Sequence, residues 1–434
     1  MSSDKENMPS ERASGLSKQN THPVAWYLYD WANSAFGTII ITFVFSVYVT
    51  KTVFDDPDTG SGYWSLTIAL AGFFVAASAP FLGRAADCSH HLGRWLWLTT
   101  TICAVACACL VFLPPDASFP LIIMALLCVA VAHATAELSY VFYNAMLPSL
   151  SDTSNMGRVS GIAWGVGYMG GIASLILVLL CCIGIGDRPP LLPFPDDGGA
   201  WGVRFSAVFV AFWYFCFALP LLLQTDANPP QTPKAKESLN ILDTLKYIAG
   251  KRGLLKLLVA SALYRDGLAT LFAVGGTFAA AAYGLNYTEL LVFAIGLNVT
   301  AGIGAMAMSR LDDVLGSKAV ILIALGGLVI TGTVILFLES KIAFIIVSLF
   351  LGLFVGPAQA ASRTFIVRLT APERTAQIFG FYALSGKAIA FLGPLIYGAL
   401  TLWTGEARVG LASIIAFWLA GGLVILTIKK SEQE

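Results

Sequence analysis

Long apolar segments recur along the whole chain, and mostly short polar connections separate them. Each segment holds about 20 residues or more, which is enough for a helix to cross the hydrocarbon core of a bilayer. The pattern therefore predicts an all-α membrane protein with twelve transmembrane helices. The expected spans are residues 24–50, 62–83, 95–113, 119–147, 159–186, 203–224, 255–282, 289–309, 318–338, 341–366, 376–402 and 408–428.

One long polar segment, residues 225–254, interrupts this pattern in the middle of the chain. It contains Pro229, Pro230 and Pro233 together with several lysines, which is typical of a linker. A short amphipathic helix is expected within it, around Leu239–Ile248. The predicted organisation is a cytoplasmic tail (1–23), a six-helix bundle (24–224), a cytoplasmic linker (225–254), a second six-helix bundle (255–428) and a cytoplasmic tail (429–434).

Composition and charge placement agree with this organisation. Hydrophobic residues make up 57% of the 434 residues and charged residues 12%, whereas a soluble domain carries about twice that charged fraction. Lys and Arg are concentrated on the side of the N-terminus, so the positive-inside rule predicts that both termini are cytoplasmic. The first residues lack the apolar core of a signal peptide. With the compact loops, this favours a bacterial inner membrane.

The two predicted halves carry related motifs after their second spans. The motifs are Gly83-x-x-x-Asp87 followed by Gly93-Arg94, and Ser309-x-x-x-Asp313 followed by Gly316-Ser317-Lys318. Repeated six-span units are typical of secondary transporters, which place their solute near the midplane between the repeats. We therefore expect two pseudo-symmetric halves and a small-molecule solute.

These motifs resemble the signature cytoplasmic loop of the major facilitator superfamily. The second copy departs from that pattern at Ser309, and the first places Asp87 too far from Gly93-Arg94. The acid can accept hydrogen bonds from the N-terminus of a neighbouring helix while the base pairs across the bundle, so the loop would latch one conformation. Ordinary positive-inside charge is the alternative. The candidate latch residues are Asp87, Arg94, Arg158, Asp313, Lys318 and Arg363.

Further strings point to a narrower group. They are YDWANSAF at Tyr29–Phe36, FYNAMLP at Phe142–Pro148, GRVSG at Gly157–Gly161, GYMGG at Gly167–Gly171, LYRDG at Leu263–Gly267, GPAQAASR at Gly356–Arg363 and FGFYALSGKAIAFLGPL at Phe379–Leu395. Together they resemble the autophagy-type vacuolar amino-acid effluxer family and its bacterial permease relatives. The resemblance implies efflux of neutral amino acids. Arg265 stands where that family usually has Asn, so the substrate preference here can differ.

The first span carries a polar stripe. Asp30, Asn33, Ser34 and Gly37 are spaced at i, i+3, i+4 and i+7, so a helix places them on one face. An intramembrane carboxylate is costly unless it is paired or hydrated, and such residues usually line a path for solute or protons. A polar patch that packs helices together is the alternative.

Other spans carry further polar groups. They are His133, Glu137, Tyr140 and Asn144 in the fourth span, Tyr264, Arg265 and Asp266 in the seventh, Gln359 and Arg363 in the tenth and Lys387 in the eleventh. Acids and bases balance among them, which suggests pairing because unpaired buried charges are costly. The superfamily resemblance implies that the first, fourth, seventh and tenth spans line the central path.

This set of charges suits a zwitterionic solute. Arg265 or Lys387 could hold a carboxylate, and Asp30, Glu137 or Asp266 could hold an ammonium group. Glu137 beside His133 is also a candidate proton carrier, and the alternative is a structural ion pair with Lys387 or Arg363. The candidate residues for substrate binding or coupling are Asp30, Asn33, His133, Glu137, Tyr140, Tyr264, Arg265, Asp266, Gln359 and Lys387.

The sequence favours a secondary transporter that works by alternating access and exports amino acids or similar small zwitterions. Protons are the candidate coupling ion. The alternatives are an exporter of another solute, such as a siderophore or an amphipathic drug, and a non-transporting sensor on the same scaffold. No nucleotide-binding, metalloprotease or nucleophile motif is found, so we expect no enzyme, no metal and no cofactor. The expected partners are the solute and the lipid bilayer, without nucleic acid, and the expected state is a monomer.

Overall fold

The computed structural model describes residues 23–89, 91–184, 188–195, 197–227, 241–285 and 287–432. Within these ranges the chain is almost entirely helical, and twelve helical segments are long and apolar enough to cross a membrane. The predicted fold class is confirmed. The tail residues 1–22 and the linker residues 228–240 lie outside the described ranges, so the limits predicted for the tail and the linker stay predictions.

The first six spans run from Pro23 to Ala227. The first span is a composite of α1 (Pro23–Ala35), η1 (Phe36–Phe43), α2 (Phe45–Tyr48) and η2 (Val49–Val53). The next five are α3 (Pro57–Ser89), α4 (Leu92–Cys109) with η3 (Leu110–Phe112), α5 (Phe119–Ala145), α7 (Met156–Val178) with η4 (Leu179–Ile183), and α8 (Trp201–Ala227). The short α6 (Leu147–Leu150) connects α5 to α7.

The last six spans follow a short helix from the predicted linker, α9 (Ile241–Gly250). They are α10 (Arg252–Tyr283), α11 (Tyr287–Leu315), α12 (Ser317–Phe337), α13 (Lys341–Leu369), the pair α14 (Thr375–Ile389) and α15 (Leu392–Thr404), and α16 (Ala407–Leu426). The turn η5 (Pro372–Arg374) precedes α14, and η6 (Lys430–Glu432) follows α16.

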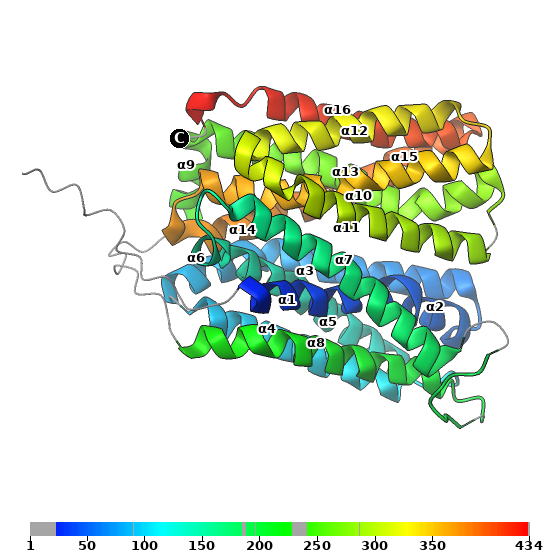
Figure 1. Cartoon of the computed structure of the whole chain (residues 1–434). Coiled ribbons are helices and arrows are strands. Elements are labelled where there is room, and N and C mark those ends of the chain that lie inside the picture. The colour runs from blue at the N-terminus through cyan, green and yellow to red at the C-terminus, as the bar shows by residue number, and fades with distance from the viewer. Residues whose placement is uncertain are drawn as a thin grey trace, which may run out of the picture.

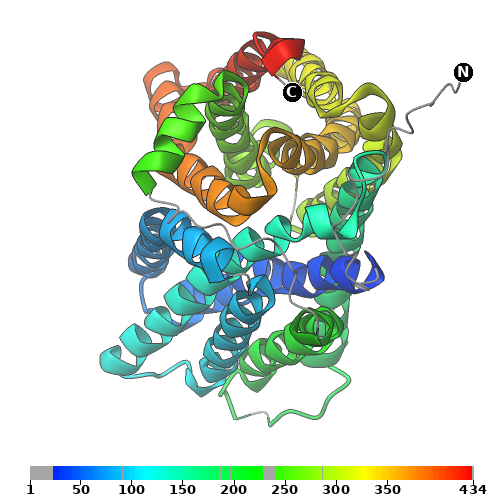
Figure 2. The same ribbon diagram turned by 90° about the vertical axis from the view of Figure 1, so that its left-hand side faces the viewer.

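The spans form two groups that lie side by side (Figure 1). Figure 2 looks along the spans and shows the first group below and the second group above. The second span of each group packs against the fifth span of the other, as α3 against α14 and α11 against α7. This exchange is what a pseudo-twofold axis between two six-helix halves requires. We call the end of the bundle where α1 begins and α16 ends the terminal end, and the opposite end the far end.

The first span is helical throughout but not regular. In η1 the turns widen to the π form, and the amide of Val44 donates to the carbonyl of Ile39, five residues earlier, at 3.1 Å. The hydroxyl of Thr42 donates to the carbonyl of Gly37 at 2.9 Å. The segment between Gly37 and Val44 is rich in β-branched residues, which crowd a regular α-helix. The span predicted at residues 24–50 therefore reaches Val53 through wider turns.

The eleventh span is broken near its middle. α14 ends at Ile389, and α15 begins at Leu392, just before Gly393 and Pro394. Pro394 lacks the amide that a continuous helix would need there, so the helix is interrupted just before it. The amide of Gly393 donates instead to the carboxylate of Asp266 on α10, at 2.8 Å.

Two sequence motifs were predicted to lie in loops, and this part of the prediction is wrong. α3 continues to Ser89 and α11 continues to Leu315, so Asp87 and Asp313 lie in the last turns of helices. Long amphipathic extensions carry both spans beyond the apolar segments. The acidic side chains are therefore held by regular helical backbone.

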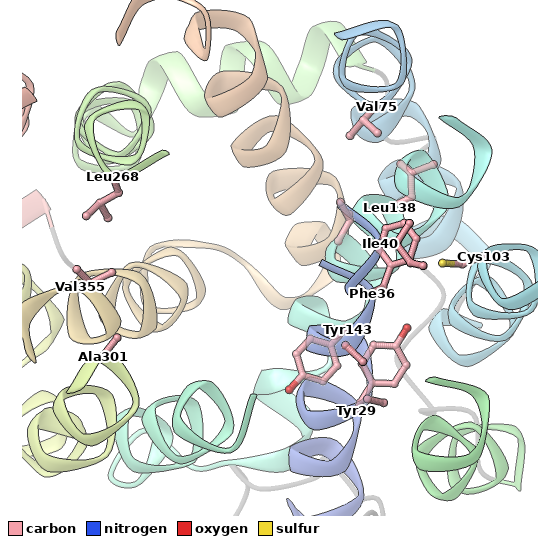
Figure 3. Close-up of a cluster of buried hydrophobic side chains, with 14 of the residues drawn as sticks. Tyr29, Phe36, Ile40, Val75, Cys103, Leu138, Tyr143, Leu268, Ala301 and Val355 are labelled. Atoms are coloured by element: carbon pink, nitrogen blue, oxygen red, sulfur yellow. The ribbon is translucent and has the colours of Figure 1, made fainter. Parts of the chain in front are cut away.

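The buried hydrophobic side chains form one cluster that extends through both halves, and Figure 3 shows part of it. Tyr29, Tyr143 and Phe36 cluster in the first half, while Leu268 and Val355 lie in the second. Within the apolar core, the hydroxyl of Tyr29 bonds those of Thr100 at 2.7 Å and Tyr214 at 2.9 Å. These bonds tie α1 to α4 and α8, so the polar stripe of α1 has a fixed orientation.

Candidate functional site

At the terminal end, α3 and α14 join the two halves. The carboxylate of Asp87 accepts hydrogen bonds from the amides of Ala376 at 3.1 Å and Gln377 at 2.8 Å, in the first turn of α14. A carboxylate is favoured there because free amides and the helix dipole meet it. The two helices also approach closely, since a Cβ at Gly83 or Gly380 would overlap backbone atoms of the opposite helix.

The second motif repeats this geometry between α11 and α7. The carboxylate of Asp313 accepts bonds from the amides of Gly157 at 2.6 Å and Arg158 at 3.1 Å, and the Nε of Arg158 lies 4.0 Å from it. A Cβ at Gly157 would lie 2.5 Å from that of Asp312. The hydrogen bonds predicted for the two acids are confirmed, and their role as a latch stays a prediction.

The basic residues of the two motifs do not pair across the bundle. Lys318 donates to the carbonyls of Leu426 and Ile428 at 3.2 and 2.5 Å, within its own half. The prediction is wrong for Lys318 because the start of α12 lies beside the free carbonyls at the end of α16, which attract a cation. The side chain of Arg94 is exposed. Arg368, which the sequence reasoning missed, pairs with Asp312 inside the second half at 2.9 Å.

Arg363 of α13 makes the most extensive contact between the halves. Its Nε and one terminal nitrogen donate to the hydroxyl and the carbonyl of Ser160 at 2.9 and 2.8 Å. Its other terminal nitrogen donates to Asn144 at 3.1 Å and lies 3.5 Å from the carboxylate of Asp30. The guanidinium carbon lies 4.5 Å from the ring centroid of Trp26. One buried cation therefore joins α13 to α1, α5 and α7.

The carboxylate of Asp30 interacts with side chains of the protein in this conformation. This carboxylate is buried, accepts a hydrogen bond from Tyr143 at 2.8 Å, interacts with Tyr140 and faces Arg363. Asn33 is buried on the same face of α1, and its amide nitrogen has no partner among the described residues. The stripe predicted on the first span therefore packs against α7 of its own half, and Asp30 also pairs with Arg363 of the other half.

A second group of charges lies farther from the terminal end. The Nζ of Lys387 on α14 lies 3.3 Å from the carboxylate of Glu137 on α5, and these side chains are 25% and 35% exposed. His133 lies one turn away on α5 and is buried. Arg265 of α10 stacks on the ring of Tyr382 at 4.0 Å and acts electrostatically on Glu137. This central charge cluster (His133, Glu137, Arg265 and Lys387) joins three elements and retains open access.

Asp266 and Tyr264, the other substrate-binding candidates on α10, do not lie where the sequence predicted. Asp266 is buried and turned toward α15, where one oxygen binds the amide of Gly393 and the other has no partner among the described residues. Tyr264 is buried and bonds Ser362 of α13 at 2.5 Å. Successive residues of a helix point about 100° apart, so Tyr264 and Asp266 cannot share the face of Arg265.

An uncharged cavity of about 500 Å³ opens in the far half of the bundle. The first span, α7, α10, α11, α12, α13 and α16 supply its walls. Its lining includes Gly37, Thr38, Phe43, Gly167, Tyr168, Gly171, Phe272, Gly275, Phe293, Asn298, Phe344, Leu351 and Trp418. Tyr168 accepts a hydrogen bond from Gln359 at 3.2 Å, which places Gln359 next to this cavity. Phe272 lies seven residues after Arg265, on the same face of α10 and about 10 Å along its axis.

The contacts, charges and cavity described above therefore lie at three successive levels along the bundle. Close helix packing and three cross-half contacts close the terminal end, through Asp87, Asp313 and Arg363. The central charge cluster follows, and the cavity lies in the far half. Such an arrangement can hold a small solute between two halves while one end of the bundle is closed.

A model of a known protein family matches most of the chain. The family model described as "Vacuole effluxer Atg22 like" matches residues 58–434. The chain is 24% identical over 419 residues to the "Uncharacterized MFS-type transporter YxiO" of Bacillus subtilis, with 94% of each chain covered. It is 23% identical over 281 residues to "Autophagy-related protein 22-1" of Neosartorya fischeri, covering 58% of this chain and 44% of that protein.

Solved structures of transporters have the same fold. A fucose transporter of the major facilitator superfamily, FucP, in its outward conformation, aligns with a TM-score of 0.74 at 12% identity, covering 94% of this chain and 98% of that chain. A bacterial homologue of the iron transporter ferroportin in the outward-facing state aligns with a TM-score of 0.72 at 15% identity, covering 95% and 99%. At this identity the match establishes the arrangement of the helices and not the solute.

Proposed function

This chain belongs to the family of vacuole effluxer Atg22-like proteins and is a multi-pass membrane transporter of the major facilitator type; we propose that it exports amino acids or similar small zwitterions by alternating access. Protons are the proposed coupling ion. The relatives and structural neighbours are transporters and not enzymes. We further propose a monomer in a bacterial inner membrane, with both termini in the cytoplasm.

The observation that carries this proposal is the Glu137–Lys387 pair. It joins the first half to the second at 3.3 Å, inside the bundle, and both side chains keep part of their surface open. Separating such an ion pair is costly unless other charges replace the lost partners. A zwitterion offers that replacement, because its ammonium group can bind Glu137 while its carboxylate binds Lys387 or Arg265. Binding would therefore bring both halves onto one solute.

The cavity supports a solute with an uncharged part. Its lining residues carry glycines, aromatic rings and a few hydroxyl or amide groups, and no charged side chain. A solute bound at the central charge cluster could direct an apolar side chain toward Phe272 and Tyr168. The same observation favours the second candidate, an exporter of larger amphipathic solutes, because a volume of about 500 Å³ exceeds what a small amino acid fills.

The closed terminal end supports alternating access. If the terminal end faces the cytoplasm, as the placement of Lys and Arg predicts, the conformation described here is closed inside. Opening requires that Asp87 and Asp313 leave the helix N-termini of the opposite half and that Arg363 leaves Asp30 and Ser160. Protonation of Asp30 or Glu137 is the proposed trigger, because it removes a charge that these contacts or the solute need.

Counterflow in proteoliposomes tests the proposal. Vesicles are loaded with one unlabelled amino acid at a time, and the uptake of a labelled neutral amino acid is followed. We expect accumulation with neutral amino acids inside and its loss in Glu137→Gln. The matched control is Glu289→Gln, which changes the same chemical group at an ion pair with Lys341, far from the cluster. No exchange of any amino acid by the folded protein would exclude this solute class and favour the amphipathic alternative.

A further inference from the structure

The short helix α9 lies at the terminal end, and its buried face holds the start of α14. The hydroxyl of Thr244 donates to the side-chain carbonyl of Gln377 at 2.6 Å and accepts a bond from Arg374 at 3.2 Å. The hydroxyl of Tyr247 accepts a bond from the amide of Ala371 at 3.1 Å. These contacts hold the residues that present the amides of Ala376 and Gln377 to Asp87, so α9 braces the contact between the halves.

The opposite face of α9 is apolar and exposed. Leu242 is 62% and Leu245 is 46% exposed, and Ala249 extends the same stripe at the spacing i, i+3, i+7. The buried residues Thr244 and Ile248 lie on the other side of the helix. A water-facing helix would not present a stripe of this kind, because exposed leucines gain nothing from contact with water.

Basic residues border this stripe and the membrane. Among the described residues Lys246 pairs with Asp243 at 3.9 Å, and Lys251 and Arg252 are exposed where α9 meets the span α10. A single residue separates the end of α9 from that span. In Figure 2 the green ribbon of α9 is seen from the side at the edge of the molecule, whereas most of the spans are seen end-on or obliquely. The helix therefore lies across the span direction at the level where a lipid headgroup layer would meet the bundle.

We propose that α9 is a membrane-surface strap that binds anionic phospholipid headgroups and thereby stabilises the closed terminal end. Leu242 and Leu245 enter the interface between headgroups and acyl chains, and Lys246, Lys251 and Arg252 bind the phosphates. The bonds of Thr244 and Tyr247 then transmit this anchoring to the start of α14 and to Asp87. The solute does not enter this inference, so it stands apart from the proposed function.

Hydrogen exchange of the full chain in nanodiscs tests the strap without any solute. The amides of residues 371–377 report whether the start of α14 is held. We expect their exchange to slow when phosphatidylglycerol is added to phosphatidylcholine discs. In Lys246→Gln and in Arg252→Gln, the factor by which phosphatidylglycerol slows exchange should be about fivefold smaller. This corresponds to roughly 1 kcal/mol for one basic residue at an anionic surface. The matched control is Arg310→Gln, an exposed base at the same end on α11.

A second variant separates lipid binding from its transmission. Thr244→Val keeps the exposed face of α9, so the amides of α9 should still respond to phosphatidylglycerol while those of residues 371–377 no longer do. Equal exchange in neutral and anionic discs, or an equal loss in Arg310→Gln, would overturn the proposal. Slowing by inorganic phosphate in neutral discs would also overturn it, because the ligand would then be a soluble anion and not a lipid.

Discussion

Arg363 connects the two halves through several contacts at once. Its guanidinium is buried and bonds Ser160, Asn144 and Asp30, which belong to three different elements. Removing one member of a buried ion pair leaves the other charge without compensation. The two members differ, however, in what remains when the partner is lost. Arg363 retains Ser160 and Asn144, whereas Asp30 retains only hydroxyl groups.

We therefore predict an asymmetry between the two substitutions. Arg363→Met should lower the free energy of unfolding by about 3–5 kcal/mol, and Asp30→Asn should lower it by much less. The double variant should be more stable than Arg363→Met alone, because no uncompensated carboxylate remains. Thermal unfolding in detergent measures all three. Equal losses for the single variants, or simple additivity in the double variant, would show that the pair contributes nothing specific.

The central charge cluster leads to a prediction about solute selection. Lys387→Ala should weaken the binding of carboxylate-bearing solutes by about tenfold or more, since a charge-assisted hydrogen bond contributes about 1.5–3 kcal/mol. Cationic amines without a carboxylate should lose little. Competition for counterflow by matched pairs, an amino acid and its decarboxylated amine, measures the difference. An equal loss for both members of a pair would exclude Lys387 as the carboxylate ligand.

At the scale of elements, the contact between α3 and α14 depends on two glycines. A Cβ at Gly83 would lie within 3.0 Å of Gln377 and overlap the carbonyl of Ala376, and one at Gly380 would overlap the backbone of α3. Both helices are regular here, so the backbones would have to separate. The hydrogen bonds between Asp87 and the start of α14 would then lengthen or break.

Gly83→Ala and Gly380→Ala should therefore favour conformations that are open at the terminal end. We expect the amides of Ala376 and Gln377 to exchange with solvent at least tenfold faster, which is about 1.4 kcal/mol. Gly62→Ala is the matched control in α3, because nothing lies within 4 Å of its added Cβ. Faster exchange in all three variants would mean that helix propensity, and not the contact, determines the result.

At the scale of the whole molecule, we predict that two symmetry-related acids determine how firmly the halves close. Asp87 and Asp313 occupy equivalent positions at the ends of α3 and α11 and bind the N-termini of α14 and α7. A carboxylate at a helix N-terminus contributes about 0.3–2 kcal/mol. If both interfaces open in the same rigid-body motion, as alternating access requires, their contributions should add.

We predict that Asp87→Asn and Asp313→Asn each shift the equilibrium toward the open terminal end by about fivefold, and that the double variant shifts it by about 25-fold. Electron spin resonance distances between labels on the two halves would measure the populations. Glu339→Gln, an exposed acid at the far end, is the control. A double variant that behaves like either single variant would mean that one latch alone controls closure.

The local features of this chain could be predicted from its sequence, because each depends on neighbours along the chain. Apolar segment length predicted the twelve spans. The acid in each repeated motif predicted a bond to a helix N-terminus, since a carboxylate favours that position wherever the helix comes from.

Which side chains meet across the bundle was decided only by the tertiary structure. The sequence left Lys387 and Arg363 as alternative partners of Glu137. In the structure Glu137 pairs with Lys387, and Asp30 pairs with Arg363. Asp266 faces the broken eleventh span and not the centre, and Lys318 binds the end of α16. Spacing along one helix determines a shared face but not the rotation of that face within a bundle. Only the packing of all the helices determines that rotation, and with it the pairing of the charges.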